Sequence, residues 1–590
     1  MFATVLGVFI SMFLIIIIFA SIIGGIISST QDSKKVEISE NSILHLKLDK
    51  EIKDRPGNNP FENFDFSSFE DRTPLGLKSI IDNIKKAKSD DKIKGIYLNV
   101  ANLKANMATT EELRNALLDF KSSGKFILSY SENYSQNEYY LSSIADEIYL
   151  NPSGEMTFKG LSATLMFFKD ALNRLDIDMQ VIRHGKFKSA IEPFIRNDMS
   201  VENRAQYTQL ISGIWKHRNE MLSQSRNIPI SELNKVADGL LLRTAKEAKD
   251  YGFVDDLRYE DEITSRLKEL LEISEDDKLN LVSFNDFKKT VLPIEIAKLG
   301  RERWNAKDEI AIIYAEGDIT SGESKENSMG SKTIAKALQD ARKDKNVKAI
   351  VLRVNSPGGS ALASDVMWRE VMLAKKEKPV VVSMGDVAAS GGYYISCAAD
   401  KIYAENATIT GSIGVFGLIP NFGKMMSSKL GIHTDQVVTN KYSDGLTLSR
   451  PLKEKEKEML QDMIENIYDD FTLKVAEGRG MSQADVDSIG QGRVWNGQSA
   501  KKIGLVDEIG GIEEAIVAAA DLADLESYKT KELPKQKIAF EALFSQFATE
   551  AKIKIFGSEF GQAEVYYHNV KRVMESNGIY SRMPVDVMIE

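Results

Sequence analysis

The sequence contains almost no cysteine: Cys397 is the one cysteine among 590 residues. A chain with one thiol cannot form an internal disulfide bond, and thiolates cannot supply a zinc cluster. Cysteine usage therefore leaves the compartment open. Cys397 lies in "YYISCAAD" (393–400), where we predict a small buried core residue rather than a thiol nucleophile. We expect neither a metal nor a cofactor.

Histidine is also scarce, and positive charge is not in excess. The chain has five histidines, and none lies near Ser390, the candidate nucleophile. This weakens the hypothesis of a Ser-His-Asp triad without excluding it, because the members of a triad can be far apart in sequence and still meet in the fold. The net charge of −10 gives no indication of a nucleic-acid partner, since proteins that bind nucleic acids concentrate positive charge.

Charged side chains are absent from Phe2 to Thr30. This apolar run can cross a bilayer core, which takes about 20 helical residues. A cleaved signal peptide is the alternative, but its apolar region usually has about 7–15 residues and follows a basic segment, which is missing here. We therefore predict an uncleaved transmembrane anchor at residues 1–30. Lys34 and Lys35, just after it, favour the cytoplasm for that side by the positive-inside rule.

An internal repeat follows the predicted anchor. Residues 77–152 align without a gap with residues 331–406, so that "YYLSSIADEIYLNP" (139–152) matches "YYISCAADKIYAEN" (393–406). A repeat of this length is far too long for a solenoid. It predicts two halves of similar fold.

Each half has the pattern of an α/β domain. "EIAIIYAEGDI" (309–319) is apolar and β-branched, and "SKTIAKALQDARKDK" (331–345) has apolar residues at helical spacing. "VKAIVLRV" (347–354) is a continuous apolar run, typical of a strand covered on both faces. Strands that alternate with helices indicate a parallel sheet with crossover connections.

The repeat and the composition together predict the domain organisation. We expect two tandem α/β halves behind a transmembrane helix, joined by a short linker and followed by a C-terminal extension. The predicted boundaries are 1–30 for the anchor, 31–289 for the first half, 290–308 for the linker, 309–534 for the second half and 535–590 for the extension.

The halves differ at a glycine-rich turn. The second half has "NSPGGS" (355–360) after a strand and before a helix, where the first half has "ANLKAN" (101–106). Glycine reaches backbone conformations that other residues avoid, so such a turn can leave N–H groups free. Free donors can stabilise a developing oxyanion. We identify the N–H groups of Gly359 and Gly391 as the candidate pair.

The halves also differ at a serine. "GDVAASGGYYIS" (385–396) places Ser390 directly before two glycines, whereas the matched position of the first half is Gln136. The second half therefore carries a local chemistry that the first lacks, and acyl transfer through Ser390 is the chemistry that fits. Asp386 and Asn355 border these motifs, and we interpret both as turn or capping residues.

A serine nucleophile requires a base. Because histidine is scarce, lysine is the other option. A lysine with a pKa near 10.4 needs a fall of roughly three units to act at neutral pH, and burial among apolar groups can lower it. Lys188, in "RHGKFKSAIEPF" (183–194), stands among small and apolar neighbours. From the residues alone, it is one candidate among many lysines.

These motifs, together with "TGSIGVFG" (410–417), resemble the signal peptide peptidase A family, also called protease IV, in its long form. The resemblance extends from about residue 40 to residue 530. It implies a Clp-protease/crotonase-like fold in each half and a serine protease with a Ser-Lys dyad. The nucleophile matches Ser390, the base matches Lys188, and Ser412 orients the lysine amine.

The resemblance also implies a substrate and a location. The family degrades remnant signal peptides after their release from preproteins. It assembles as a homotetramer on the bacterial cytoplasmic membrane, with a single-pass anchor and the catalytic domains outside the cytoplasm. This topology conflicts with the orientation that Lys34 and Lys35 favour.

Two other functions remain open at this stage. A crotonase-type acyl-CoA enzyme also holds an oxyanion with backbone N–H groups, but it relies on glutamates and a CoA pocket. A membrane-anchored scaffold that has kept the fold without activity is the second alternative. Labelling by a serine-reactive acylating probe that is lost in Ser390→Ala separates the peptidase from the acyl-CoA enzyme. The scaffold predicts instead that Ser390→Ala and Lys188→Ala leave the biological role intact.

Overall fold

The computed structural model describes Gly7 and residues 37–57, 64–65, 70–71, 73–290, 306–325, 327–536 and 578–582. The predicted anchor, apart from Gly7, lies outside these residues, as do most of the predicted linker and extension. Within the part of the chain that is described, no helix is both long and apolar enough to span a bilayer. The domain boundaries stay predictions.

The first half contains a six-stranded sheet in the order β10-β8-β7-β6-β1-β11, and every neighbouring pair is parallel. Helices α2 (Leu77–Ser89), α3 (Met107–Lys121) and α4 (Gln136–Ser142) belong to its crossover connections. The strands are β1 (Ser42–Lys47), β6 (Ile93–Asn99), β7 (Phe126–Tyr134), β8 (Glu147–Met156), β10 (Asp256–Leu257) and β11 (Asn280–Ser283).

The second half contains an eight-stranded sheet with the path β21-β19-β17-β15-β12-β23, while β18 pairs with β17 and β22. All pairs are parallel except β19 with β21. Helices α13 (Ser331–Lys343), α14 (Ala361–Lys375), α15 (Gly391–Ser396) and α20 (Ile512–Leu522) accompany it. The strands are β12 (Glu309–Glu316), β15 (Val347–Ser356), β17 (Val380–Ala389), β18 (Lys401–Ala404), β19 (Ile409–Gly411), β21 (Val494–Asn496), β22 (Glu508–Ile509) and β23 (Lys529–Leu533).

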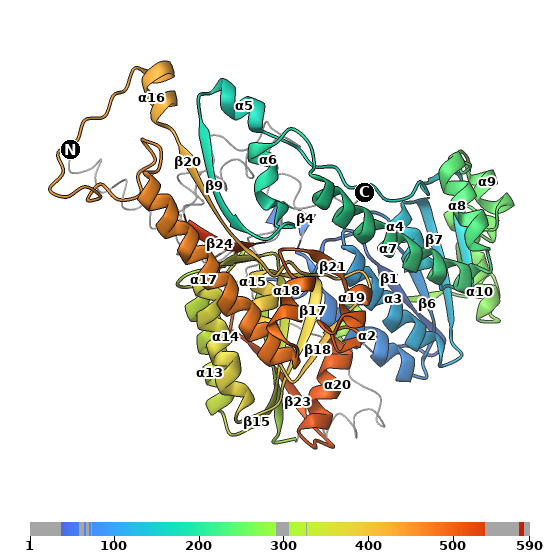
Figure 1. The fold of residues 1–590 in the computed structure, drawn as a ribbon. Helices are drawn as coiled ribbons and strands as arrows, with labels where there is room; N and C mark the ends of the chain where they lie inside the picture. Colours follow the sequence, from blue (N-terminus) through green and yellow to red (C-terminus); the bar gives the residue numbers. More distant parts are fainter. Residues whose placement is uncertain are drawn as a thin grey trace.

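The sequence repeat appears as one shared strand order. The run β8-β7-β6-β1 of the first half corresponds to β18-β17-β15-β12 of the second. A mixed α/β architecture with parallel sheets is therefore present in both halves, as the alternation of strands and helices predicts. Figure 1 shows the two sheets side by side, with the helices packed around them.

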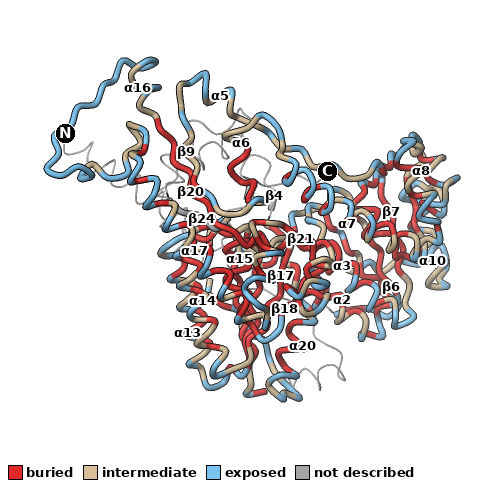
Figure 2. Tube along the Cα trace, in the orientation of Figure 1, coloured by how far each residue is buried: buried red, intermediate tan, exposed pale blue. Residues whose placement is uncertain are grey.

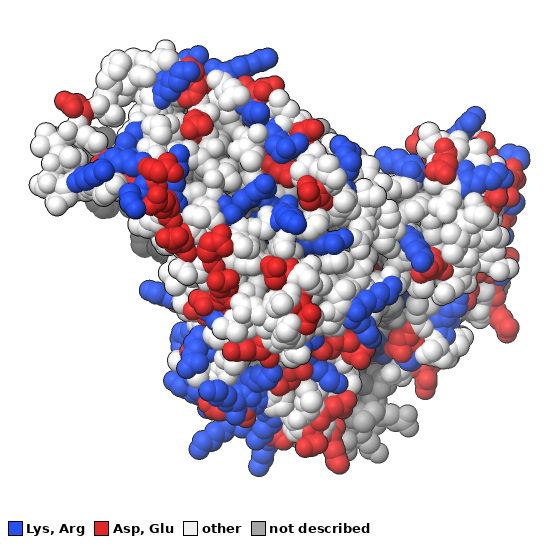
Figure 3. Space-filling view, viewed as in Figure 1, with Lys and Arg blue, Asp and Glu red and all other residues white. Residues whose placement is uncertain are grey.

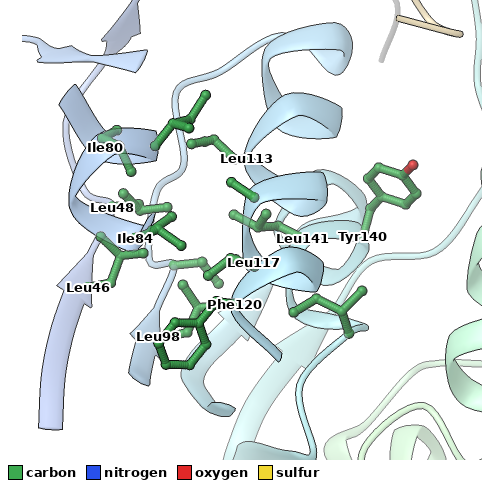
Figure 4. Close-up of a cluster of buried hydrophobic side chains, with 14 of the residues drawn as sticks. Leu46, Leu48, Ile80, Ile84, Leu98, Leu113, Leu117, Phe120, Tyr140 and Leu141 are labelled. Atoms are coloured by element: carbon green, nitrogen blue, oxygen red, sulfur yellow. The ribbon is translucent and has the colours of Figure 1, made fainter. Parts of the chain in front are cut away.

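One hydrophobic core joins the halves. Figure 4 shows its first-half part, where side chains from β1, β6 and helices α2, α3 and α4 meet. Along β12, Ile310 and Ile312 belong to this shared cluster, whereas Ala311 and Ile313 belong to a second cluster on the opposite face. Alternate strand residues point to opposite faces, so one face of the second sheet packs toward the first half. Figure 2 shows the central strands buried over most of their length.

A third sheet contains strands from both halves, in the order β14-β13-β16-β24-β20-β9. Strand β9 of the first half pairs antiparallel with β20 of the second, from Asp178↔Asn421 to His184↔Val415. This pairing brings the segment after β9 into the second half. The strands are β9 (Asp178–His184), β13 (Asp318–Thr320), β14 (Ser328–Gly330), β16 (Gly358–Ser360), β20 (Val415–Asn421) and β24 (Gly578–Arg582).

Two helices of 26 residues support this region, α7 (Val201–Arg226) and α17 (Glu454–Arg479). The inner face of α17 buries Leu460, Ile464 and Tyr468 in a cluster with residues of β9 and β20. Its outer face carries a row of acidic side chains, which Figure 3 shows along the course of the helix. This division into one apolar and one charged face is the pattern of a helix at the protein surface.

Candidate active site

Lys188 and Ser390 meet at the junction of the two halves. Lys188 Nζ lies 2.8 Å from Ser390 Oγ, 3.0 Å from Ser412 Oγ and 3.1 Å from Ser412 O. All three side chains are fully buried. Lys188 therefore contacts both serines that the resemblance indicates. Ser390 lies 202 positions and Ser412 224 positions after Lys188 in the chain.

Ser390 lies on a sharp turn between a strand and a helix. Strand β17 ends at Ala389, and helix α15 begins at Gly391. Ser390 has φ 57° and ψ −113°, a conformation that is unfavourable for a residue with a side chain and that is concentrated at functional sites. Its backbone N–H donates to Gly411 O at 2.8 Å, which fixes the turn to the end of β19.

Lys188 is the central residue of a tight turn just after β9. Its backbone angles are φ −73° and ψ 77°, and Ser189 N donates to Phe187 O at 2.8 Å; together these define an inverse γ-turn. Phe187 N donates to Gln491 O at 3.0 Å. The lysine turn of the first half is thus attached directly to a loop of the second half.

Burial changes the proton affinity of the lysine. Removal of the amine from water lowers the pKa of Lys188 well below its ordinary value, because burial disfavours the charged form. Its three nearest oxygen partners are hydroxyl and carbonyl groups, and no carboxylate among the described residues forms an ion pair with it. A neutral amine facing a serine hydroxyl is the arrangement that general-base catalysis requires.

The proposed oxyanion donors lie on two adjacent segments. Gly391 is the first residue of α15, directly after Ser390. Gly359 lies in β16, where a Cβ atom would be 2.1 Å from Ile319 O. The segments touch where Gly392 meets Ser356, since a Cβ at position 392 would lie 2.7 Å from Ser356 O. Glycine is therefore sterically required on both segments, and the oxyanion role stays a prediction.

Asp386, four residues before Ser390, caps a helix of the other half. Its carboxylate accepts hydrogen bonds from Ala108 N and Thr109 N, both at 3.0 Å, and from Thr109 Oγ1 at 2.7 Å. These donors lie in the first turn of α3. Asn355 has a comparable linking role, because it donates to Asp54 and accepts from Val387 N. Both side chains connect the segments next to Ser390 to the first half.

The position in the first half that matches Ser390 is filled by an amide. Gln136 Oε1 accepts from Lys159 N and Gly160 N, both at 2.9 Å, and Gln136 Nε2 donates to Gly160 O at 3.0 Å. These hydrogen bonds occupy the side chain entirely with backbone groups. The first half therefore supplies the lysine but presents no nucleophile at this turn.

Cys397 has the properties of a core residue. Its side chain is fully buried and its Sγ donates to Tyr394 O at 3.2 Å. Burial raises the pKa of the thiol to about 12, which disfavours the thiolate that a nucleophile requires. Among the residues that the structure describes, no group of three or more His, Cys, Asp or Glu side chains is arranged to hold a metal ion.

Glu192, which no sequence motif indicates, holds the segment after the lysine turn against α7. Its buried carboxylate accepts from Ser200 N at 3.1 Å, Ser200 Oγ at 2.5 Å and Asn203 Nδ2 at 2.8 Å. These contacts hold the start of α7 against the segment that follows Lys188. A glutamate beside a proline has no pattern that distinguishes such a role.

Comparison with known proteins decides the family. A model of peptidase family S49 matches residues 119–274 and 372–526, and a Clp protease model matches residues 300–410. The chain is 40% identical over 450 residues to Protease 4 of Haemophilus influenzae, which covers 75% of this chain and 72% of the relative. The chain belongs to peptidase family S49. It is therefore a serine protease with a tandem duplicated, Clp-protease-like α/β fold.

Other S49 relatives agree. Protease 4 of Salmonella typhi is 37% identical over 462 residues, covering 77% of this chain and 73% of the relative. The chloroplastic Serine protease SPPA of Arabidopsis thaliana is 35% identical over 462 residues, covering 76% and 66%. Because the chain belongs to a serine protease family, the hypotheses of an acyl-CoA enzyme and of an inactive scaffold are excluded.

Proposed function

We propose that this chain is a membrane-anchored endopeptidase that degrades remnant signal peptides with a Ser390–Lys188 dyad. The observation that carries the proposal is the 2.8 Å approach of the buried lysine amine to the serine hydroxyl. The amine comes from the first half and the hydroxyl from the second, so one chain contains the complete dyad.

The first chemical step transfers one proton and forms one bond. The neutral Lys188 amine accepts the Ser390 hydroxyl proton while Ser390 Oγ attacks the carbonyl carbon of the scissile peptide bond. The carbonyl π electrons move to oxygen, and the resulting oxyanion accepts hydrogen bonds from the N–H groups of Gly359 and Gly391. Removing one donor of this kind typically costs about 2.7–4 kcal/mol of barrier.

The second step releases the leaving peptide and regenerates the enzyme. The Lys188 ammonium donates its proton to the departing nitrogen as the carbon–nitrogen bond breaks, which leaves an acyl ester on Ser390. A water molecule then gives its proton to the neutral amine and attacks the ester, and the lysine returns that proton to Ser390 Oγ. No cofactor is needed for this balance.

Ser412 orients the base. A neutral amine has two N–H groups and one lone pair. If the N–H groups donate to Ser412 Oγ and Ser412 O, at 3.0 and 3.1 Å, the lone pair faces Ser390. Ser412 N in turn donates to Arg493 O at 2.7 Å. Ser412 thus acts through Lys188.

An extended peptide fits the strand that carries Gly359. Strand β24 runs antiparallel to β16 with the pairs Gly358↔Arg582, Gly359↔Ser581 and Ser360↔Tyr580. The glycine-rich strand is therefore able to pair with an extended chain segment, the mode known as β-augmentation. Because Ser390 has no exposed surface, we infer that a substrate peptide takes the position beside β16 that β24 has here.

The sequence and the relatives support the proposed substrate class, membrane attachment and assembly. A relative from Enterococcus faecium named putative signal peptide peptidase SppA is 37% identical over 180 residues. The uncharged run from Phe2 to Thr30 supports a single-pass anchor in the bacterial cytoplasmic membrane, with the catalytic domains outside the cytoplasm. Leu430, Ile432 and Val437 are exposed apolar residues close together in the chain, which supports a contact between copies of this chain in the homotetramer that the family resemblance implies.

Cleavage of a synthetic signal peptide in detergent micelles tests the proposal. We expect the full-length chain to cut within the apolar core of the peptide, as mass spectrometry of the products can show. Lys188→Met and Ser390→Ala abolish cleavage, and Lys186→Met is the matched control, since Lys186 is exposed two residues earlier. Full activity in either dyad variant contradicts the proposed mechanism.

A further inference from the structure

A buried glutamine lies directly behind the lysine turn. Gln206, on α7, is 1% exposed. Its Nε2 donates to Phe187 O at 3.2 Å and to Ser189 Oγ at 2.9 Å. Gln206 therefore contacts both chain neighbours of Lys188 without contacting the lysine amine.

The other end of the same amide reaches the strands that hold the two serines. Gln206 Oε1 accepts a hydrogen bond from Val494 N at 3.3 Å. Val494 pairs with Gly411 in the antiparallel contact of β21 with β19. Gly411 O accepts the Ser390 N–H at 2.8 Å. One side chain thus extends from the turn that carries the base to the strand pair that holds the nucleophile.

The orientation of the amide is fixed by a third acceptor. Nε2 also lies 3.0 Å from Asn203 Oδ1, and Asn203 Nδ2 donates to the buried Glu192 carboxylate. Phe187 O and Asn203 Oδ1 can only accept hydrogen bonds, which identifies the atom beside them as the donating nitrogen. A buried polar network with every member satisfied holds its groups rigidly.

We propose that Gln206 is a positioning residue that holds the Lys188 turn in register with strands β19 and β21. The inference rests on the proposed Ser-Lys dyad. The turn lies outside the regular strand β9 and contains a single i→i+2 hydrogen bond, so it needs outside support. A displacement of the base by about 1 Å can cost roughly 10²-fold in rate.

The test compares two substitutions at this position with a control on the same helix. Gln206→Met keeps the length of the side chain and removes every hydrogen bond. Gln206→Glu keeps the oxygen that accepts from Val494 N and removes the donors. Gln224→Met is the control, because Gln224 lies on the exposed face of α7. Activity is expressed per active site, titrated with a serine-acylating probe.

We expect kcat to fall by about 10- to 100-fold in Gln206→Met, with KM within about twofold of the wild type, because peptide binding does not involve this residue. The rise of kcat with pH also moves to higher pH, since a displaced amine regains contact with water and its pKa rises. Gln206→Glu changes both quantities in the same direction, and Gln224→Met changes neither.

An unchanged kcat per titrated site together with an unchanged pH midpoint overturns the inference, even if the melting temperature falls. If Gln206→Met does not fold, kcat per titrated site and the pH midpoint of Gln206→Glu test the inference instead. Peptide cleavage by the Lys188→Met variant contradicts the proposed dyad instead, so the two failures are distinguishable.

Discussion

Gly492 approaches Lys188 so closely that a Cβ atom at position 492 would lie 2.6 Å from the Cα and Cβ atoms of the lysine. Gly492 also has φ 83°, in the left-handed region where glycine is favoured. The loop of the second half therefore packs directly against the lysine turn, in addition to the contacts from α7.

The first prediction concerns this contact. In Gly492→Ala, the new methyl group forces the lysine turn away, and we expect kcat to fall by about 10²-fold with a smaller change in KM. Steady-state kinetics of peptide cleavage measure both. Gly480→Ala is the matched control, because Gly480 has φ 62° but open space at its Cβ position. An equal loss in both variants would assign the effect to backbone strain instead of the contact.

The second prediction concerns stability. The folded-state pKa of Lys188 is well below its ordinary value, so between these two values the unfolded chain binds a proton that the folded chain does not. The free energy of unfolding of the wild type therefore rises with pH through this window. We expect Lys188→Met to be more stable than the wild type at neutral pH, by an amount that shrinks toward about pH 10.

Urea unfolding at a series of pH values measures this difference. Lys186→Met is the control, since its side chain is exposed in the same segment. A stability difference between Lys188→Met and the wild type that does not change with pH would show that the amine is not neutral in the folded state.

The third prediction separates orientation from chemistry. Ser412→Ala removes one of the two oxygens that hold the amine but leaves Ser412 O in place, 3.1 Å from Nζ. We expect a loss of about 10-fold in kcat, because one hydrogen bond to a buried group contributes about 0.5–1.5 kcal/mol. Ser390→Ala and Lys188→Met lose far more. A loss in Ser412→Ala equal to that of Ser390→Ala would mean that Ser412 takes part in the chemistry.

The fourth prediction concerns the buried ion pairs between the halves. Arg353 donates to Asp54 at 2.8 Å and to Glu112 at 2.6 Å, and all three side chains are buried. Arg353→Met leaves two carboxylates without their cation, and breaking such a buried pair typically costs about 3–5 kcal/mol. Chemical unfolding of the wild type and of Arg353→Met measures this loss in the free energy of unfolding.

The control for Arg353 is Arg342→Met, because Arg342 pairs with the exposed Glu377 at the surface. Surface pairs contribute about 0–1 kcal/mol. Equal losses in Arg353→Met and Arg342→Met would show that the halves do not depend on the buried pair.

Much of the fold follows from the sequence, because local patterns determine it. The apolar run at 347–354 predicts the buried strand β15, and the repeat predicts the shared strand order of the two halves. The glycines of "NSPGGS" (355–360) predict a turn between a strand and a helix, and the chain turns there from β15 into β16 and α14 (Ala361–Lys375). These features depend on periodicity and on the conformational range of glycine, which short segments already contain.

The contacts across the two halves could not be predicted from the residues alone. Lys188 is one of many lysines, and only a family resemblance selects it. The pairing of β9 with β20 and the cap that Asp386 provides for α3 join residues far apart in the chain. In the sequence, nothing distinguishes Gln206 from the other polar residues of a charged helix. Its role depends on which face of α7 the fold buries, and this is set by tertiary packing.

The central claim is that a neutral Lys188 activates Ser390. The most direct measurement is the rate at which a serine-acylating probe labels the enzyme as a function of pH, in the wild type and in Lys188→Met. We expect the wild-type rate to rise with pH through the lowered pKa of Lys188 and the variant to show no such rise, because only the neutral amine accepts the proton. A wild-type rate that stays flat from about pH 6 to about pH 9, or that Lys188→Met reproduces, would contradict the account.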